Sequence, residues 1–527
     1  MFQMCVSLKG GSRLGRAPCS ASCPLVSLKS LKSLKSPFSL LSPLSLSSSV
    51  PVLPVLPLIP MLLTATALLV GGRDALAAQA LPPEAAQALQ RAGVPAEALS
   101  TVVYDLTTSR RVLQWQEQKS VNPASLAKLL TTMAALDRLG PAWAWTTPVW
   151  LTGPVKDGVL DGHLHIKGSG DPKLVLERVW LLLRRVQQQG VREIRGDIVL
   201  DNSAFAVPEV DPGEFDGEPL RPYNVRPSAL LLNFRSVVYT LVPDDAAGVA
   251  RVLADPALSG TQVDRTVPLV AGPCGDWRSA LKATFEPGKT RFAGSYAQAC
   301  GELNWPVADP QAATYDARLI ESLWKEMGGH LQGVVREGPA PSDTKPTLEL
   351  RSAPLAEVIR DINKFSNNLM SQQLFLTLAL PARRNGPATL ESAREVVTRW
   401  LVERTGEVGT DTVVDNGSGL SRKGRITALR LARLLEQAHD SPVMSELMSS
   451  LPISGLDGTL RRSRATPGRA HLKTGSLRDV AAVAGYVLSN SGRRYVVVAI
   501  INHPNANAAR PALDAVVQWT MRDTPAR

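Results

Sequence analysis

Three short motifs, far apart in the chain, carry side chains whose types and spacing suit nucleophilic chemistry. In the first, Ser125 and Lys128 are three residues apart, so a helix would place the hydroxyl and the amine on one face. A serine hydroxyl becomes a useful nucleophile when a base takes its proton. Lys128 can be that base only as a neutral amine, which requires burial or a second nearby cation to lower its pKa from about 10.4.

The residues around Ser125 predict the helix that this arrangement needs. Asn122 suits the capping position, Pro123 the first helical position, and apolar residues continue through Met133 and Leu136. The N-terminus of such a helix brings backbone N–H groups and a positive dipole close to a developing oxyanion. Spacing alone does not select this pair, because a solvated lysine on a helix explains most such sequences. The same spacing recurs at Ser279/Lys282, Ser322/Lys325 and Ser342/Lys345.

Two further motifs add groups that could act with this serine. Ser366-Asn367-Asn368 lies in a stretch of helical pattern, where a hydroxyl and a carboxamide could relay a proton and hold a peptide group. Lys473-Thr474-Gly475 comes directly before an apolar hairpin. On a strand, Lys473 and Gly475 would project alike, and the glycine would let a substrate backbone approach. Ser120-Val121-Asn122 has the same form as the second motif, so only the combination is specific.

In this order, the three motifs resemble the signature of the penicillin-recognising serine enzymes. The gap of 241 residues between Ser125 and Ser366 is much longer than in a compact β-lactamase. It is similar to that of the class C low-molecular-mass penicillin-binding proteins, the D-alanyl-D-alanine carboxypeptidase/endopeptidase family. Residues 168–172, 415–422 and 451–460 also resemble that family, and the resemblance covers residues 83–510.

The resemblance implies a two-step acyl transfer on peptidoglycan stem peptides, with no cofactor and with β-lactam antibiotics as acylating inhibitors. Ser125 would be the acylated nucleophile, Lys128 its base and Ser366 a proton relay toward the leaving amine. Backbone N–H groups of Ser125 and Ser476 would form the oxyanion hole. The substrate-binding residues would be Asn368 on the peptide, Lys473 and Thr474 on the terminal carboxylate, and Gly475 and Ser476 beside them.

The resemblance also implies an α+β fold: a β-lactamase/transpeptidase-like domain, with an antiparallel sheet flanked by helices, interrupted by a large insertion of β-rich modules. Residues 204–310 are rich in Pro, Gly and β-branched residues, whereas helical patterns dominate residues 355–404 and 427–449. Residues 480–488 and 495–501 form a predicted hairpin. We expect residues 78–147 and 349–527 to form the two parts of one domain, and residues 148–348 to be the inserted modules.

Residues 1–77 are expected to be a low-complexity extension and a signal peptide. The apolar run 58–70 has the length of a secretory segment, and Ala75-Leu76-Ala77 offers a small-x-small cleavage signature. An uncleaved anchor or a start at Met61 stays open. Export places the mature protein in the periplasm and leaves Cys274 and Cys300 as its two cysteines. In an oxidising compartment we expect them to form a disulfide.

Composition and charge argue against several other functions. The net charge of +11 divides into +6 over residues 1–77 and +5 over the other 450, and aromatic residues are only 5%, so a nucleic-acid surface is not supported. His163 and His165 have no evident third ligand, so no metal site is expected. Residues 168–170 lack the rest of a phosphate loop. Leu181–Leu183 suits a buried core, although peripheral membrane contact stays open.

Two alternative functions remain at this level. A β-lactamase-like hydrolase would share the fold but would need a fast deacylation base. A non-catalytic cell-wall-binding protein would use the inserted modules to recognise glycan or partners. The sequence does not decide between carboxypeptidase and endopeptidase preference, and it leaves the oligomeric state open.

Overall fold

The computed structural model describes residues 80–381 and 386–523. The expected extension and signal peptide therefore lie outside the described residues. Within the described ranges, no helix combines the length and the apolar character needed to cross a membrane.

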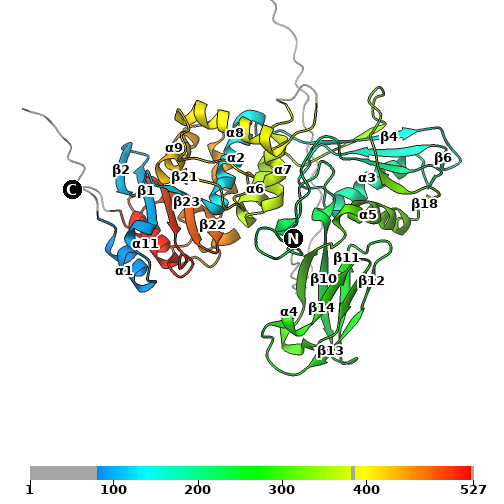
Figure 1. The fold of residues 1–527 in the computed structure, drawn as a ribbon, viewed down its shortest axis with the longest axis horizontal. Helices are drawn as coiled ribbons and strands as arrows, with labels where there is room; N and C mark the ends of the chain where they lie inside the picture. Colours follow the sequence, from blue (N-terminus) through cyan, green and yellow to red (C-terminus); the bar gives the residue numbers. More distant parts are fainter. Residues whose placement is uncertain (1–79, 382–385, 524–527) are drawn as a thin grey trace, which may run out of the picture. The chain divides into compact units, whose positions relative to one another are not determined.

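A five-stranded antiparallel sheet is built from both ends of the described chain (Figure 1). Its strand order is β2-β1-β24-β23-β22, so the first two strands pair with the last three. The hairpin expected near the C-terminus is present as β23 and β24. The bounds are β1 (Leu99–Asp105), β2 (Arg110–Trp115), β22 (Ala470–Leu477), β23 (Val480–Leu488) and β24 (Arg494–Asn502).

Helices cover both faces of this sheet, because alternate residues of its strands enter two different cores. Ala482 and Val498 belong to one core, whereas Val483 and Val497 belong to the other. Helices α1 (Pro83–Arg91) and α11 (Arg510–Met521) lie side by side on the second core (Figure 1). The first core holds α2 (Ala127–Leu139), α6 (Leu355–Phe365), α7 (Asn368–Thr377), α8 (Leu390–Thr405), α9 (Ala428–His439) and α10 (Met444–Ser450). A two-stranded sheet pairs β3 (Ser120–Val121), which lies shortly before α2 in the chain, with β21 (Ile426–Thr427), which lies directly before α9.

The segment between α2 and α6 forms separate sheets. A mixed five-stranded sheet has the order β19-β9-β7-β4-β20, with β19 (Val335–Glu337), β9 (Ile198–Asp201), β7 (His163–Lys167), β4 (Thr146–Thr152) and β20 (Leu348–Arg351). A smaller sheet has the order β18-β8-β6-β5, with β18 (His330–Leu331), β8 (Glu193–Ile194), β6 (Val159–Leu160) and β5 (Val155–Lys156). Helices α3 (Leu176–Gln188) and α5 (Ala312–Glu326) pack on their shared core. Leu182 and Leu183 of α3 are buried in that core.

Residues 236–308 form a β-rich module. Its first sheet has the order β16-β13-β11-β10-β17, with β16 (Tyr296–Ala297), β13 (Thr266–Val270), β11 (Val249–Asp255), β10 (Ser236–Asp244) and β17 (Leu303–Ala308). Its second has the order β12-β15-β14, with β12 (Gln262–Val263), β15 (Lys289–Phe292) and β14 (Ala283–Glu286). A short helix, α4 (Trp277–Ala280), precedes β14.

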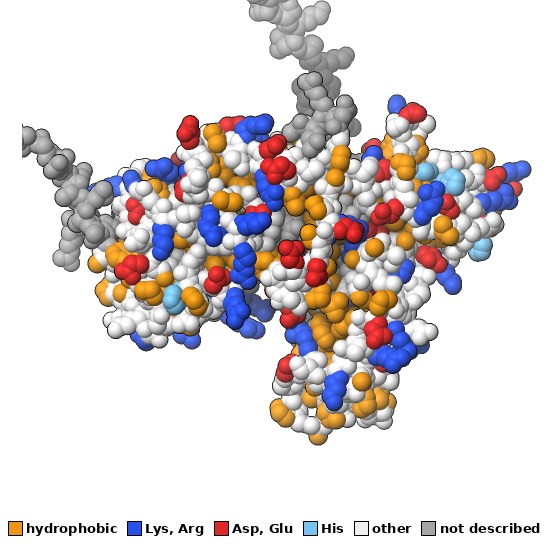
Figure 2. Space-filling view, in the orientation of Figure 1, with side chains coloured by type: hydrophobic (Ala, Val, Ile, Leu, Met, Phe, Trp, Pro, Cys, Tyr) orange, Lys and Arg blue, Asp and Glu red, His pale blue; other side chains and the backbone are white. Residues whose placement is uncertain are grey.

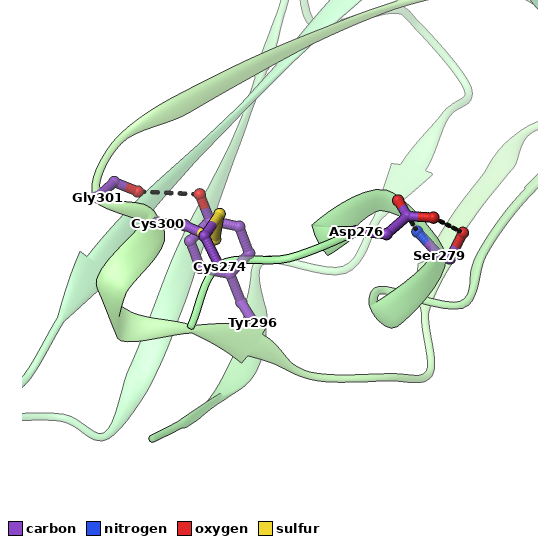
Figure 3. The surroundings of a disulfide bond; sticks show 6 residues. All are labelled: Cys274, Asp276, Ser279, Tyr296, Cys300 and Gly301. Carbon is purple, nitrogen blue, oxygen red and sulfur yellow. Dashed lines mark hydrogen bonds between the residues drawn. A yellow bond between two sulfur atoms is a disulfide. The ribbon is translucent and has the colours of Figure 1, made fainter. Parts of the chain in front are cut away.

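The expected disulfide is present in this module. Cys274 and Cys300 are bonded across a separation of 26 residues, near Tyr296 (Figure 3). The Tyr296 hydroxyl donates to the carbonyl of Gly301 at 2.9 Å, which fixes the turn that carries Cys300. By the chain-entropy estimate, closing a loop of this size stabilises the fold by about 3 kcal/mol.

Acidic side chains lie among the basic ones on the face seen in Figure 2. His163 of β7 has a structural role, because its Nδ1 accepts the N–H of Asp197 at 2.8 Å. Within the described ranges, no group of three or more His, Cys, Asp or Glu side chains is arranged to hold a metal ion.

Candidate active site

The candidate nucleophile lies on a tight turn that precedes α2. Ser125 is the middle residue of the 3₁₀ turn η2 (Ala124–Leu126). The Ala124 N–H donates to Asn122 Oδ1 at 2.8 Å, which holds this turn, but the expectation that Asn122 caps the helix is wrong, because the residue before α2 is Leu126. The expectation that Pro123 opens the helix is wrong. Ala124 has a positive φ of 46°, a left-handed conformation that α-helix cannot include, so α2 begins only after η2.

Lys128 is completely buried and contacts three oxygen atoms. Its Nζ lies 2.9 Å from Ser125 Oγ, 2.6 Å from Asn368 Oδ1 and 2.5 Å from the Ser418 carbonyl oxygen. A neutral amine has two N–H donors and one lone pair. The two carbonyl oxygens can accept only from N–H groups, so they direct the lone pair toward the Ser125 hydroxyl. This geometry suits proton abstraction from the serine.

Burial also favours the neutral form of this amine. The pKa of Lys128 is well below its ordinary value, first because burial removes water from the charged form and then because Lys473 is a nearby cation. Burial lowers the pKa of Lys473 to about 7. Lys128 can act as a base only if its pKa is lowered. Both of the expected causes, burial and a second cation, lower that pKa here.

The Ser418 carbonyl comes from the 415–422 segment, whose role the sequence did not define. Asn416 Oδ1 accepts the N–H groups of Ser418 and Gly419 at 3.1 and 3.2 Å, which holds the turn. Gly419 has φ +79°, and a Cβ there would lie 1.8 Å from the Ala124 carbonyl oxygen. Only glycine fits this contact. The turn therefore packs directly on the backbone that carries Ser125.

Ser366 and Asn368 occupy the junction of two helices rather than the middle of one. Ser366 has left-handed φ/ψ of 56° and 38° at the C-terminal cap of α6, and Asn368 is the first residue of α7. Asn367 caps α7 by accepting the N–H of Met370 at 3.0 Å. The helical pattern on both sides of the motif concealed this break. The break turns the Ser366 hydroxyl toward Lys473, whose Nζ lies 2.9 Å away.

Strand β22 carries the third motif next to the nucleophile turn. Lys473 and Gly475 share one side of the strand, as expected, and both are buried. A Cβ on Gly475 would lie 2.8 Å from the Pro123 carbonyl oxygen, so the missing side chain lets β22 approach this turn closely. The seven candidate residues of the three motifs, with Ser476 next to them on β22, therefore belong to one connected site.

Two residues outside the motifs contact the outward side chains of β22. Thr474 Oγ1 donates to Thr459 Oγ1 at 2.7 Å, and Arg510 Nη2 donates to Ser476 Oγ at 2.7 Å. Thr459 lies in residues 451–460, whose resemblance to the family was noted from the sequence, so the sequence did point to this segment. Arg510 opens α11, and no local pattern pointed to it.

A cavity of about 450 Å³ adjoins Asn368 and Ser476. The Arg422 guanidinium lies over the Phe215 ring at 4.6 Å from its centroid. The lining residues are Phe215, Asp216, Tyr223, Asn368, Leu420, Arg422, Ser476, Leu477 and Arg478. The cavity is therefore shared by a loop of the central segment and the elements that carry the motifs.

A known enzyme family and several known proteins match most of this chain. Residues 84–523 match the D-Ala-D-Ala carboxypeptidase 3 (S13) family, which is well over half of the chain. The chain belongs to this family. The D-alanyl-D-alanine carboxypeptidase DacB of Haemophilus influenzae is 24% identical over 384 residues, covering 72% of this chain and 80% of that protein. The D-alanyl-D-alanine carboxypeptidase of Actinomadura sp. strain R39 is 28% identical over 443 residues, which cover 79% of each chain.

The fold agrees with that of a solved relative. Penicillin binding protein 4 from Haemophilus influenzae superposes with a TM-score of 0.66 at 22% identity, covering 82% of this chain and 99% of that chain. The expected resemblance to the class C low-molecular-mass penicillin-binding proteins and the expected α+β fold are confirmed. The chain is a serine-type D-Ala-D-Ala carboxypeptidase.

Proposed function

We propose that Ser125 is the nucleophile with which this S13 enzyme removes the terminal D-alanine from peptidoglycan stem peptides. The observation that carries the assignment is the Lys128 amine, buried, with two carbonyl acceptors and with the Ser125 hydroxyl as its third neighbour. Burial lowers the pKa of this amine, which favours the neutral form that can accept the serine proton.

In the first step, Ser125 Oγ attacks the carbonyl carbon of the penultimate D-alanine while its proton passes to Lys128. Collapse of the tetrahedral intermediate breaks the peptide bond and leaves an ester on Ser125. The proton that Lys128 accepted passes on through Ser366, whose hydroxyl contacts Lys473, to the departing D-alanine nitrogen, so Lys128 is again a neutral amine. Water then attacks the ester, Lys128 takes its proton, and Ser125 leaves with a proton as the acid product is released. Penicillin would follow the first step, with its β-lactam amide in place of the peptide.

The remaining motif residues would bind the substrate. Asn368 holds the peptide, and Lys473 and Thr474 engage the terminal carboxylate, whose charge favours the protonated Lys473. Gly475 leaves room for the substrate backbone. The N–H groups of Ser125 and Ser476 form the oxyanion hole. The cavity beside Ser476 has the size and mixed lining to take the part of the stem peptide that precedes the scissile bond.

The wider setting is proposed on the same basis. The enzyme acts in the periplasm after export through the segment 1–77. Residues 78–147 and 349–527 form the catalytic domain, and residues 148–348 form the inserted modules. Endopeptidase cleavage of cross-links uses the same chemistry with a bulkier leaving amine.

Intact-mass spectrometry after incubation with penicillin tests the nucleophile. The wild-type chain should gain one adduct, mapped to Ser125, and Ser125→Ala should gain none. Ser342→Ala is the matched control, because the exposed Ser342 has the same Ser-x-x-Lys spacing and should leave the adduct unchanged. An adduct that persists on Ser125→Ala contradicts the assignment.

Release of D-alanine from a pentapeptide ending in D-Ala-D-Ala tests turnover. Wild-type protein should release it, and Lys128→Met should not, although it should still bind the peptide. Rapid loss of the penicillin adduct with catalytic penicillin hydrolysis would instead favour a β-lactamase. A chain that forms no adduct and releases no D-alanine would be a wall-binding protein.

A further inference from the structure

A segment outside the three catalytic motifs lies between two of the elements that carry them. Residues 451–460, called here the 451–460 loop, run beside the start of β22: the Leu472 N–H donates to the Pro452 carbonyl at 2.9 Å, and the Ser454 N–H donates to the Ala470 carbonyl at 2.9 Å. The loop therefore has a fixed register on the strand that presents Lys473.

The other side of the loop is fastened to the end of α6 by an ion pair. Lys364 Nζ lies 2.6 Å from Asp457 Oδ2, and the Lys364 side chain is only 5% exposed. The second oxygen of Asp457 accepts the Ile453 N–H at 2.8 Å, so one carboxylate contacts both Lys364 and the backbone of the loop. Lys364 is two residues before Ser366, so this ion pair restrains the turn that presents the proposed proton relay.

Close backbone packing supports the same contact. Gly458 has φ +54°, and a Cβ there would lie 2.5 Å from the Lys364 carbonyl oxygen. The loop is therefore pressed against the last turn of α6, and Thr459, the next residue, reaches Thr474 Oγ1. Ser366 itself has a left-handed conformation that non-glycine residues rarely adopt, so it needs restraint from outside its own helix.

Together these contacts close a ring around the proton-relay side of the site. Lys364 binds Asp457, Thr459 binds Thr474, and Lys473 returns to Ser366 Oγ at 2.9 Å. We propose that Lys364, Asp457 and Thr459 are positioning residues. They hold the Ser366 hydroxyl at the distance from the Lys473 amine and the Thr474 hydroxyl that catalysis needs. The inference rests on the proposed function, because it assigns these residues a purpose only if Ser366 and Lys473 act in catalysis.

The three variants should separate by kinetic parameter. Asp457→Asn keeps an acceptor for Ile453 but loses the charge that fixes Lys364, so kcat for D-alanine release should fall about 10- to 100-fold with KM within about threefold. Asp457→Glu should recover part of the loss. Thr459→Val should instead raise KM several-fold, because the Thr474 side chain loses the neighbour that holds its hydroxyl in the orientation that faces the substrate carboxylate.

A double-mutant cycle and a matched control isolate the contact. If Lys364 and Asp457 act through one contact, the variant with both Lys364→Met and Asp457→Asn should be no slower than the slower single variant. Asp411→Asn is the control, because Asp411 pairs with Arg430 and is 35% exposed, the same as Asp457. It should change neither kcat nor KM.

The outcomes distinguish this inference from the proposed function. Rates are normalised to folded protein by thermal melting and far-UV circular dichroism. A merely structural ion pair would lower the melting temperature of Asp457→Asn and leave kcat of the folded enzyme at the wild-type value, which would overturn the inference. A wild-type chain that releases no D-alanine and forms no penicillin adduct would overturn the proposed function instead.

Discussion

Replacing Lys473 with methionine should abolish activity and yet stabilise the fold at neutral pH. Burial lowers the pKa of the Lys473 amine from the ordinary 10.5 to about 7. One pKa unit corresponds to about 1.4 kcal/mol, so the lowered pKa means that the protonated lysine destabilises the folded state by at most about 5 kcal/mol. Methionine has a similar shape and no charge. It leaves the Thr474 carbonyl without the donor 2.6 Å away, which costs about 1–3 kcal/mol.

The free energy of unfolding of Lys473→Met should therefore exceed that of the wild type by about 2–4 kcal/mol at pH 7. The pH dependence of this difference gives the sharper test. Between pH 7 and 10.5 the unfolded chain binds a proton at Lys473 that the folded chain has released, so wild-type stability rises with pH across this window. That stability is lost as the pH falls from 10.5 to 7, and below 7 both states carry the proton. Methionine binds no proton, so the advantage of Lys473→Met should shrink as the pH approaches 10.5.

Differential scanning calorimetry of the wild type and Lys473→Met from pH 6.5 to 10 measures the difference between their melting temperatures. Lys364→Met is the matched control, because Lys364 is also buried but is paired with Asp457, so its loss should destabilise the fold. A gap between wild type and Lys473→Met that is independent of pH would refute the reasoning. So would a Lys473→Met variant that is less stable than wild type at pH 7.

Two further predictions concern residues around the nucleophile. Gly419→Ala should slow acylation by fluorescent penicillin at least about 100-fold, because its Cβ would lie 1.8 Å from the Ala124 carbonyl and displace the turn that carries Ser125. Gly406→Ala is its control, with φ +78° and no atom within 4 Å, and acylation at equal rates in the two variants would contradict the packing argument. Arg510→Ala should raise KM for a D-Ala-D-Ala peptide about three- to tenfold with kcat nearly unchanged, because Arg510 orients Ser476 Oγ from an exposed position. Steady-state kinetics would exclude that role if KM stayed at the wild-type value.

The motifs and several elements could be predicted from local sequence. The β23–β24 hairpin follows from two apolar runs around a polar turn, and Lys473 and Gly475 share a side of β22 because side chains alternate along a strand. Local patterns predicted the positions where helices begin and end less well. Ser366 lies between two apolar helices, and only its left-handed backbone separates them. The nucleophile turn was likewise predicted as the start of a helix.

Residues without a local signal were missed for a physical reason. The Ser418 carbonyl that binds Lys128 is a backbone group, so no residue type reveals it, and it comes from 290 positions away in the chain. Arg510 reaches Ser476 because α11 packs under the sheet that ends in β22. Such contacts depend on how whole elements pack, and the spacing within one segment does not contain that information.

By itself, the sequence determined which reactive groups exist, the family to which they point, and the strand and helix patterns that carry most of them. Only the tertiary structure decided whether those groups could react. A lysine is protonated at neutral pH in any local segment. Lys128 becomes a base because packing removes water from its amine, brings the Lys473 charge near, and supplies carbonyl oxygens from two distant segments.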